Sequence, residues 1–186
     1  QLIEKQPSSW YTNFASRPGK LFDAVNRALT IFISSRVSDN SHRIFSTNYQ
    51  KWNSDTRENL ITTVTYCEVN RVRSSFWVPK LGDPLERIIL SKLLATKTLL
   101  SSSIGKSKNL IYYRTTGGLY WKVFTNFAPA FKCNGKTGHS SRETTFTLNK
   151  IANVKSTIAL LSSNLFWWWY TVTSNLRDLN PSDIQG

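Results

Sequence analysis

The stretch YYRTTGGLYWKVF, residues 112–124, indicates how this chain folds. The segments around it, NLIYYR and LYWKVFTNF, are rich in aromatic and β-branched residues, which favour strands. Between them, Gly117 and Gly118 supply the positive φ that a tight turn requires. We therefore predict a β-hairpin around residues 115–118. Because side chains alternate along a strand, one face of this hairpin can pack while the other displays charge.

Further strands are expected on both sides of the hairpin. The segment RETTFTL, residues 142–148, alternates in the manner of a strand. The run ALTIFIS, residues 28–34, is typical of a buried strand in a larger sheet. Residues 37–53 are polar, and we expect a connection or a domain boundary there. Residues 57–73 fit either a helix or a strand, and the sequence leaves this open.

Two helices are expected. Asp83 is a candidate N-cap, Pro84 suits the first helical position, and the amphipathic pattern continues to about Leu100. A second helix is expected from Ile151 or Ala152 to a point before Asn180. It contains LFWWWY, residues 165–170, which we interpret as core packing because the apolar stretch is too short to cross a membrane. These elements predict an α+β fold.

Loops are expected in two basic segments of the chain. The serine-rich residues 101–109, with two lysines, suit a connector that could cover a phosphate backbone. Pro129, Gly135 and Gly138 predict an irregular loop between the hairpin and the last strand.

Charge is the strongest signal of a partner. The chain has 186 residues and 24 Lys and Arg against 11 Asp and Glu, a formal charge of +13. From Arg87 to Arg142 there are ten basic residues and no Asp or Glu. A tract without acidic residues lets positive potential accumulate, which suits a polyanion such as nucleic acid.

The remaining composition narrows the class of protein. An apolar fraction of 40% excludes a wholly disordered chain. Cys67 and Cys133 lie far apart, which suits reduced thiols rather than a disulfide framework or a zinc cluster. The N-terminus lacks the layout of an export signal, so we expect a cytoplasmic protein. The sequence has no Met, even at position 1, and is expected to be an excised domain, a processed product or the product of an incomplete reading frame.

No catalytic constellation is visible in the sequence. His42 and His139 lack metal-ligand spacing, and Gly117-Gly118 does not form a phosphate-binding loop. We therefore expect no catalytic residue and no metal site in this chain.

The candidate binding residues come from the acid-free tract. Its lysines can neutralise phosphates, and arginine can also grip guanine with two hydrogen bonds. The loop of residues 132–144 adds groups that can donate to phosphates or read base edges. The basic and polar candidates are Lys106, Lys108, Arg114, Lys122, Lys132, Asn134, Lys136, Ser140, Ser141 and Arg142.

Three segments carry a resemblance to a known family. They are YYRTTGGLYWKVFTNFAPAF, then NGKTGHSSRET, then ALLSSNLFWWWYTVTSNLRDLNPSDI. Together they resemble the C-terminal target-recognition region of bacterial adenine-specific DNA methyltransferases from type II restriction-modification systems. FASRPGKLFDAVNRALTIFIS resembles the segment that closes the catalytic sheet just before that region. The resemblance implies that residues 1–50 are the end of a catalytic domain and residues 51–186 a recognition domain.

The resemblance also implies the chemistry of the whole enzyme. Such enzymes take a methyl group from S-adenosylmethionine and transfer it to the amino group of a flipped adenine. The required Gly-rich loop and Asn-Pro-Pro-aromatic motif are missing from this sequence, and Asn180-Pro181-Ser182 does not replace the latter. The expected partners are therefore double-stranded DNA and an upstream catalytic domain or subunit, with no cofactor in this chain itself and no membrane.

The resemblance assigns a role to each group of candidates. Lysines of the tract would contact phosphates, and Arg114, Asn134, Ser140 and Arg142 would contact base edges in the major groove. Thr115 and Thr116 would donate to phosphate or touch a thymine methyl group.

Three alternatives remain open at the level of sequence. An RNA-binding module would use the same basic and aromatic residues by stacking on unpaired bases. An interaction domain of a larger complex would use the aromatic surface and be insensitive to salt. A nuclease or transferase with its own site is disfavoured by the shortage of acidic residues.

Overall fold

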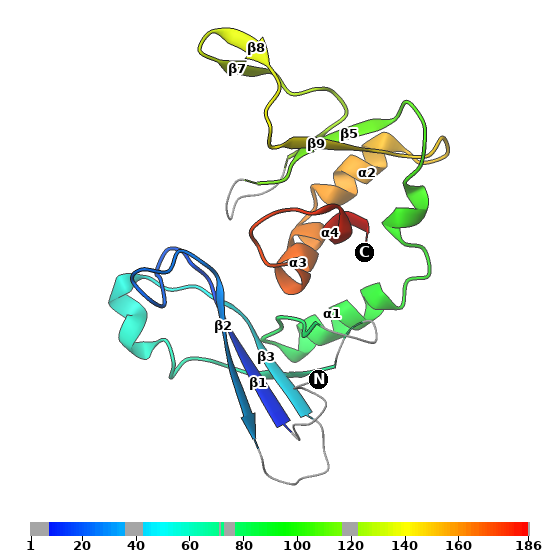
Figure 1. Cartoon of the computed structure of the whole chain (residues 1–186). Coiled ribbons are helices and arrows are strands. Elements are labelled where there is room, and N and C mark those ends of the chain that lie inside the picture. The colour runs from blue at the N-terminus through cyan, green and yellow to red at the C-terminus, as the bar shows by residue number, and fades with distance from the viewer. Residues whose placement is uncertain (1–7, 36–42, 71, 73–76, 117–122, 186) are drawn as a thin grey trace. The chain divides into compact units, whose positions relative to one another are not determined.

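The fold is taken from a computed structural model, which describes residues 8–35, 43–70, 72, 77–116 and 123–185 (Figure 1). The chain divides into two compact units, Gln1–Ala95 (unit 1) and Thr96–Gly186 (unit 2). Both units combine strands with helical segments, so the α+β prediction is confirmed. The division lies after residue 95 rather than after residue 50, and the roles assigned to residues 1–50 and 51–186 stay predictions.

Unit 1 is built on a four-stranded mixed sheet. Its strands are β1 (Ser8–Phe14), β2 (Leu29–Ser35), β3 (Arg43–Gln50) and β4 (Cys67–Val69), in the order β2-β1-β3-β4. β1 runs antiparallel to β2 and parallel to β3, and β3 runs antiparallel to β4. The segment with an ambiguous pattern contains both types of structure, because the 3-10 helix η2 (Ser54–Asn59) and β4 both overlap it.

Two predictions for this sheet are wrong. The ALTIFIS strand exists as β2, but it is the edge strand, and Phe32 and Ile33 are 40% and 56% exposed. The polar segment expected to be a connection contains β3. Ser46 and Thr47 of β3 are fully buried. The Asn13 side-chain amide of β1 donates to Ser46 Oγ at 3.2 Å and to the Thr47 carbonyl oxygen at 2.7 Å. Hydrogen bonds to a neighbouring strand thus make a polar strand suitable for burial.

The core of unit 1 includes a cluster of Phe14, Trp52 and Leu60. The rings of Phe14 and Trp52 meet edge to face, with centroids 5.8 Å apart. Gly19 lies against this cluster, and a Cβ at that position would stand 2.5 Å from the Trp52 ring nitrogen. The bend around Gly19 is therefore held by close packing against Trp52.

The first predicted helix forms as α1 (Pro84–Leu94). Asp83 caps it as predicted, accepting a hydrogen bond from the Leu85 N–H at 2.6 Å. Glu86 accepts from the Gly82 N–H at 2.9 Å. The helix ends at Leu94, short of the expected Leu100, and a separate 3-10 turn, η3 (Leu100–Ser103), follows in unit 2.

Unit 2 contains a three-stranded antiparallel sheet in the order β6-β5-β9. Its strands are β5 (Leu110–Arg114), β6 (Phe124–Thr125) and β9 (Glu143–Thr147). The pairing of β5 with β6 confirms that the two arms of the predicted hairpin meet. Its Gly-Gly turn and Lys122 lie outside the described residues. β9 confirms the predicted strand at residues 142–148.

The predicted C-terminal helix is wrong in its extent, because the segment contains three shorter helices. These are α2 (Val154–Leu161), α3 (Asn164–Thr173) and α4 (Pro181–Gln185). Ser163 starts α3 as an N-cap, accepting a hydrogen bond from the Phe166 N–H at 3.2 Å. Serine competes for backbone donors in this way, so the helix breaks at residues 162–163.

The inner face of the β6-β5-β9 sheet packs on α2, which contacts β5 and β6. Tyr113, Phe124 and Phe166 form a line of ring contacts there. Tyr170 is almost fully buried, whereas Trp167, Trp168 and Trp169 are each half-buried. The core interpretation of LFWWWY therefore holds fully for Tyr170 and partly for the tryptophans.

The loop predicted around Gly135 is a second hairpin, made of β7 (Phe131–Cys133) and β8 (Lys136–Gly138). Asn134 and Gly135 connect the strands with φ of 49° and 76°. An Asn-Gly pair favours this two-residue turn with positive φ. The prediction of an irregular loop is wrong, because the Asn134-Gly135 turn joins two paired strands although Pro129 and Gly138 lie close by.

No helix in the described ranges is both long and apolar enough to cross a membrane.

Candidate nucleic-acid interface

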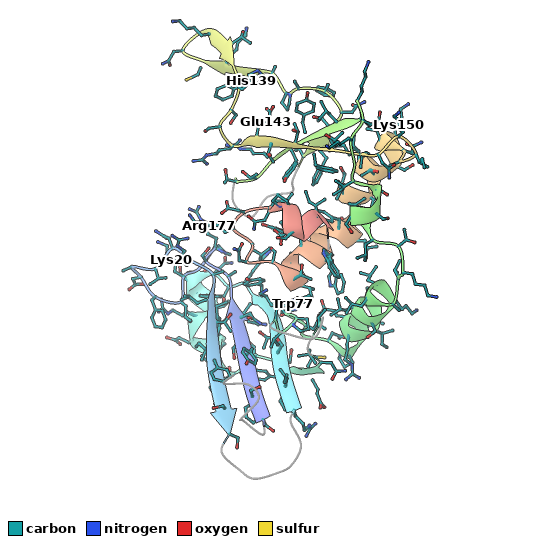
Figure 2. All side chains as sticks on the ribbon, turned by 45° about the vertical axis from the view of Figure 1, so that its right-hand side comes forward. Lys20, Trp77, His139, Glu143, Lys150 and Arg177 are labelled. Atoms are coloured by element: carbon teal, nitrogen blue, oxygen red, sulfur yellow. The ribbon has the colours of Figure 1, made fainter. Side chains whose placement is uncertain are left out.

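The structure separates the candidate residues into three groups within unit 2. Lys106 and Lys108 lie before β5, at the end of the sheet where β9 finishes. A second group lies at the opposite end of the same strands: Arg114, Thr115, Thr116, Ser140, Ser141 and Arg142. The third group, Lys132, Asn134 and Lys136, belongs to the β7–β8 hairpin. Figure 2 shows the two ends of β9, with Glu143 at its start and Lys150 just beyond its finish.

We call Lys106, Lys108 and Lys150 the lysine end of the sheet. The Gly105 N–H donates to the Thr147 carbonyl oxygen at 2.9 Å, and the Leu148 N–H donates to the Asn109 carbonyl oxygen at 2.9 Å. These bonds bring the segment around Lys106 and Lys108 beside the residues that precede Lys150. All three lysines are exposed.

The backbone at the lysine end is held by side chains as well. Ser107 Oγ donates to the Leu148 carbonyl oxygen at 2.7 Å and accepts from the Asn109 N–H at 2.9 Å. Asn149 Nδ2 donates to the Ser102 carbonyl oxygen at 3.1 Å. Gly105 fits closely here, since an added Cβ would stand 2.9 Å from the Asn149 Cβ. The segment expected to be a flexible connector is thus a fixed platform on which Ser107 points inward and two lysines point outward.

The lysine end has no acidic residue near it in sequence. No Asp or Glu occurs in residues 87–142 or 144–177, and Glu143 lies at the other end of β9. Unit 2 as a whole has eleven basic and three acidic side chains, a net charge of +8, against thirteen and eight in unit 1. The surplus positive charge of unit 2 therefore includes three lysines with no carboxylate near them in sequence, although α4, which carries Asp183, contacts η3.

We call Arg114, Arg142 and Arg177 the arginine end. The Arg142 carbonyl oxygen accepts from the Thr115 N–H at 3.0 Å, and the Thr115 carbonyl oxygen accepts from the Leu179 N–H at 2.8 Å. These bonds bring residues from three distant segments together. Arg114 and Arg142 are exposed, and the Arg177 side chain is 64% exposed.

Carboxylates accompany these arginines. Glu143 lies directly opposite Arg114 in the β5–β9 register, where side chains share one face of the sheet. Arg177 Nε lies 3.6 Å from an Asp178 carboxylate oxygen. The arginine end is therefore more nearly neutral than the lysine end, although three of the four residues expected to read base edges, Arg114, Ser140 and Arg142, lie there.

The hydroxyl groups at the arginine end are partly used inside the protein. Thr115 Oγ1 donates to the Arg142 carbonyl oxygen at 3.2 Å, and Ser140 Oγ accepts from the Arg142 N–H at 3.3 Å. The Thr116 hydroxyl oxygen is buried, with no hydrogen-bond partner in the described part of the chain. Ser141 is exposed. These hydroxyls shape the end of the sheet, and only Ser141 points freely to solvent.

The hairpin group stands apart from the sheet. Residues 126–139 are all exposed, including Lys132, Asn134 and Lys136. In the β7–β8 register Lys132 lies opposite Thr137 and Lys136 lies opposite Cys133, which puts the two lysines on opposite faces.

Two basic residues of these groups were missed by the sequence analysis. Lys150 and Arg177 lie outside the acid-free tract, because Glu143 and Asp178 interrupt the sequence pattern. The strand pairing of β9 with β5 would have indicated Lys150, since it sets residues 148–150 against residues 103–109. Nothing in the sequence indicated Arg177, because its place depends on the backbone contact between Thr115 and Leu179.

Burial raises the pKa of two tyrosines beneath the sheet. Desolvation raises the pKa of Tyr113 on the inner face of β5. Burial also raises the pKa of Tyr170 on α3 to about 12. The apolar layer under the sheet therefore favours neutral phenols, and the charge of unit 2 stays on its outside.

Comparisons with protein-family models, with curated proteins and with solved structures found no match for this chain.

Proposed function

We propose that unit 2 recognises a base sequence in duplex DNA, as the target-recognition part of an adenine-specific methyltransferase of a type II restriction-modification system in the cytoplasm. The observation that carries this proposal is the charge of unit 2. Unit 2 has eleven basic and three acidic side chains. All three lysines of the lysine end are exposed, and no carboxylate lies close to them in sequence. A phosphate backbone is the polyanion that such a surface fits.

The lysine end and the arginine end have different tasks in this proposal. The lysine end neutralises phosphates, because lysine is a point charge without directional readout. Arg114 and Arg142 contact bases or phosphates next to Glu143, whose carboxylate makes unspecific binding at this end weaker. Phosphate contacts set the register of the protein on the duplex, and the contacts to base edges set the sequence.

Methyl transfer is assigned to a separate catalytic domain or subunit. S-adenosylmethionine would require a glycine-rich turn open to the cofactor. The described glycines of unit 1, Gly19 and Gly82, are instead closely packed, since a Cβ added at each would stand 2.5 Å from Trp52 and 3.0 Å from Asn48, respectively. The described residues therefore do not fit the cofactor, and no step of methyl transfer is derived from them.

The test is a selection from a pool of random duplexes with the complete chain, followed by competition of the enriched duplex against single-stranded RNA. We expect enrichment of one short sequence and preference for the duplex. Preference for single-stranded RNA would replace the proposal with the RNA-binding alternative. Binding that is weak and independent of salt would favour the interaction domain.

A further inference from the structure

We propose that the β7–β8 hairpin enters the major groove of duplex DNA and reads base edges there. This inference rests on the proposed function and names a second element, beside the arginine end, that contacts base edges. It comes from the shape, exposure and charge of the hairpin, which Figure 1 shows joined to the rest of unit 2 by single connecting segments.

The shape of the hairpin is well defined. Asn134 and Gly135 both have positive φ, 49° and 76°, which is the geometry of a tight two-residue turn that matches the twist of a β-ribbon. The register pairs Phe131 with Gly138, Lys132 with Thr137 and Cys133 with Lys136. The segment is therefore a short two-stranded ribbon with a narrow tip.

Exposure sets this ribbon apart from the other strands of unit 2. All side chains of residues 126–139 are exposed, and nothing lies within 4 Å of a Cβ added at Gly135 or Gly138. A hairpin that served the core would bury one face, as β5 buries Ile111 and Tyr113. Both faces of this ribbon are open, which is the condition for insertion into a groove that surrounds it.

The positive charge of the ribbon suits a groove with a phosphate backbone on each side. Lys132 and Lys136 lie on opposite faces, and no acidic residue occurs anywhere between Arg87 and Arg142. The major groove of B-DNA is about 12 Å wide and admits a two-stranded β-ribbon, with a phosphate backbone on each side. Each lysine can therefore face one backbone.

The tip carries the group that can read a base. Asn134 is exposed, and an asparagine amide can donate to and accept from the major-groove edge of adenine together. Thr137 adds a methyl group and a hydroxyl group on the Lys132 face. The deep and narrow major groove of A-form RNA does not admit such a ribbon, so of the two kinds of duplex the ribbon fits DNA.

The first experiment replaces residues 131–138 by Gly-Ser, which joins Ala130 to His139 across the neck of the hairpin. Since no hydrogen bond joins residues 128–139 to other described parts of unit 2, the unfolding transition should not change. Affinity is measured by fluorescence anisotropy for the duplex enriched by the wild-type chain and for random duplex. We expect the ratio of these affinities to fall about tenfold or more.

A matched pair of variants separates readout from charge. Asn134→Gly keeps the positive-φ turn and removes only the amide that reads a base, so the affinity ratio should fall as in the replacement. Lys106→Gln with Lys108→Gln changes the lysine end, so both affinities should fall and their ratio should stay the same. An unchanged ratio in the hairpin variants would overturn this inference while the proposed function stands.

The groove is tested through the exposed Cys133, because the other cysteine, Cys67, is buried. An iron chelate that produces hydroxyl radicals is attached to Cys133, or to Ala159→Cys on α2 in a Cys133→Ser chain. Cleavage within the enriched site from Cys133, and little from position 159, is expected. Glucosylated hydroxymethylcytosine, which fills the major groove, should abolish the sequence preference.

The outcomes distinguish the two proposals. If the wild-type chain shows no binding to any duplex, the proposed function fails and this inference fails with it. If the chain binds and enriches a sequence but cleavage from Cys133 falls outside the site, or glucosylation of an enriched site that contains cytosine has no effect, the readout lies elsewhere and only this inference fails.

Discussion

The two ends of the β6-β5-β9 sheet are similar in basic residues and different in their surroundings. The lysine end holds Lys106, Lys108 and Lys150 on a platform fixed by backbone and side-chain hydrogen bonds, with no carboxylate nearby in sequence. At the arginine end, Arg114 faces Glu143 and Arg177 pairs with Asp178. A basic tract in a sequence therefore does not give the distribution of charge in space, because strand pairing decides which residues become neighbours.

Disrupting the core beneath the sheet that joins these two ends should cause the largest loss of stability. Ile111 of β5 is fully buried, so Ile111→Ala should lower the free energy of unfolding by about 2–5 kcal/mol. Leu110→Ala on the outer face, where the side chain is 36% exposed, is the matched control and should cost much less. Chemical denaturation measures both. Equal losses would mean that the inner face is not the core of unit 2.

Alkaline pH should weaken the same layer. Burial raises the pKa of Tyr170 to about 12, so the folded state keeps the phenol proton where the unfolded chain, with a pKa near 10, has lost it. Stability therefore falls as pH rises from about 10 to 12, by about 2–3 kcal/mol for this group. Tyr170→Phe should flatten that part of the profile in denaturation experiments. An unchanged profile would contradict the assigned burial.

The lysine end should dominate the salt dependence of DNA binding. Lys106→Gln, Lys108→Gln and Lys150→Gln together should lower the slope of log affinity against log salt by about 2.7 and weaken binding of random duplex by tenfold or more. The control removes three exposed basic residues of unit 1 by Arg17→Gln, Arg27→Gln and Lys51→Gln, which leaves the same net charge. If both variants lose affinity equally, net charge rather than the lysine end determines binding.

The arginine end should affect specificity more than general affinity. Arg114→Ala or Arg142→Ala should each cost about 1–3 kcal/mol on the enriched duplex and relax the sequence preference. Glu143→Gln removes the carboxylate opposite Arg114 and should tighten binding of random duplex a few-fold. Anisotropy on both duplexes measures these effects. Uniform weakening of every duplex by the arginine variants would show that they contact only phosphates.

A change in the hairpin turn should have the mildest consequence. Gly135 has φ of 76°, which costs an alanine about 1 kcal/mol, and it has open space around it. Gly135→Ala should therefore speed amide exchange in β7 and β8 without changing the global free energy of unfolding. Gly138→Ala is the control, because its φ is not positive. A global loss of stability would mean that the hairpin packs on the unit.

Local signals in the sequence predicted local structure well. The Asp83 cap, the β5–β6 pairing and the β9 strand were all predicted, because each depends on capping or alternation within a few residues. The Asn-Gly turn of β7–β8 is also a local signal, but Pro129 and Gly138 close to it are equally typical of an irregular loop.

The remaining errors depend on distant neighbours. β3 has many polar residues, and its buried Ser46 and Thr47 are satisfied by hydrogen bonds from Asn13 of β1, which is distant in sequence. The apolar ALTIFIS run forms β2, which pairs with β1 alone among the described strands, and its Phe32 and Ile33 stay exposed. For the candidate site, residue types indicated the arginines and lysines, whereas their separation into two ends and the places of Lys150 and Arg177 follow from backbone pairing.

DNA binding by unit 2 is tested first through the affinity of the complete chain for random duplex DNA, measured by fluorescence anisotropy from 50 to 300 mM salt. The three lysines of the lysine end and the two of the hairpin predict at least five phosphate contacts, hence a slope of log affinity against log salt of about −4.5. A slope near zero would show that the positive surface of unit 2 does not bind DNA and would contradict the proposed function.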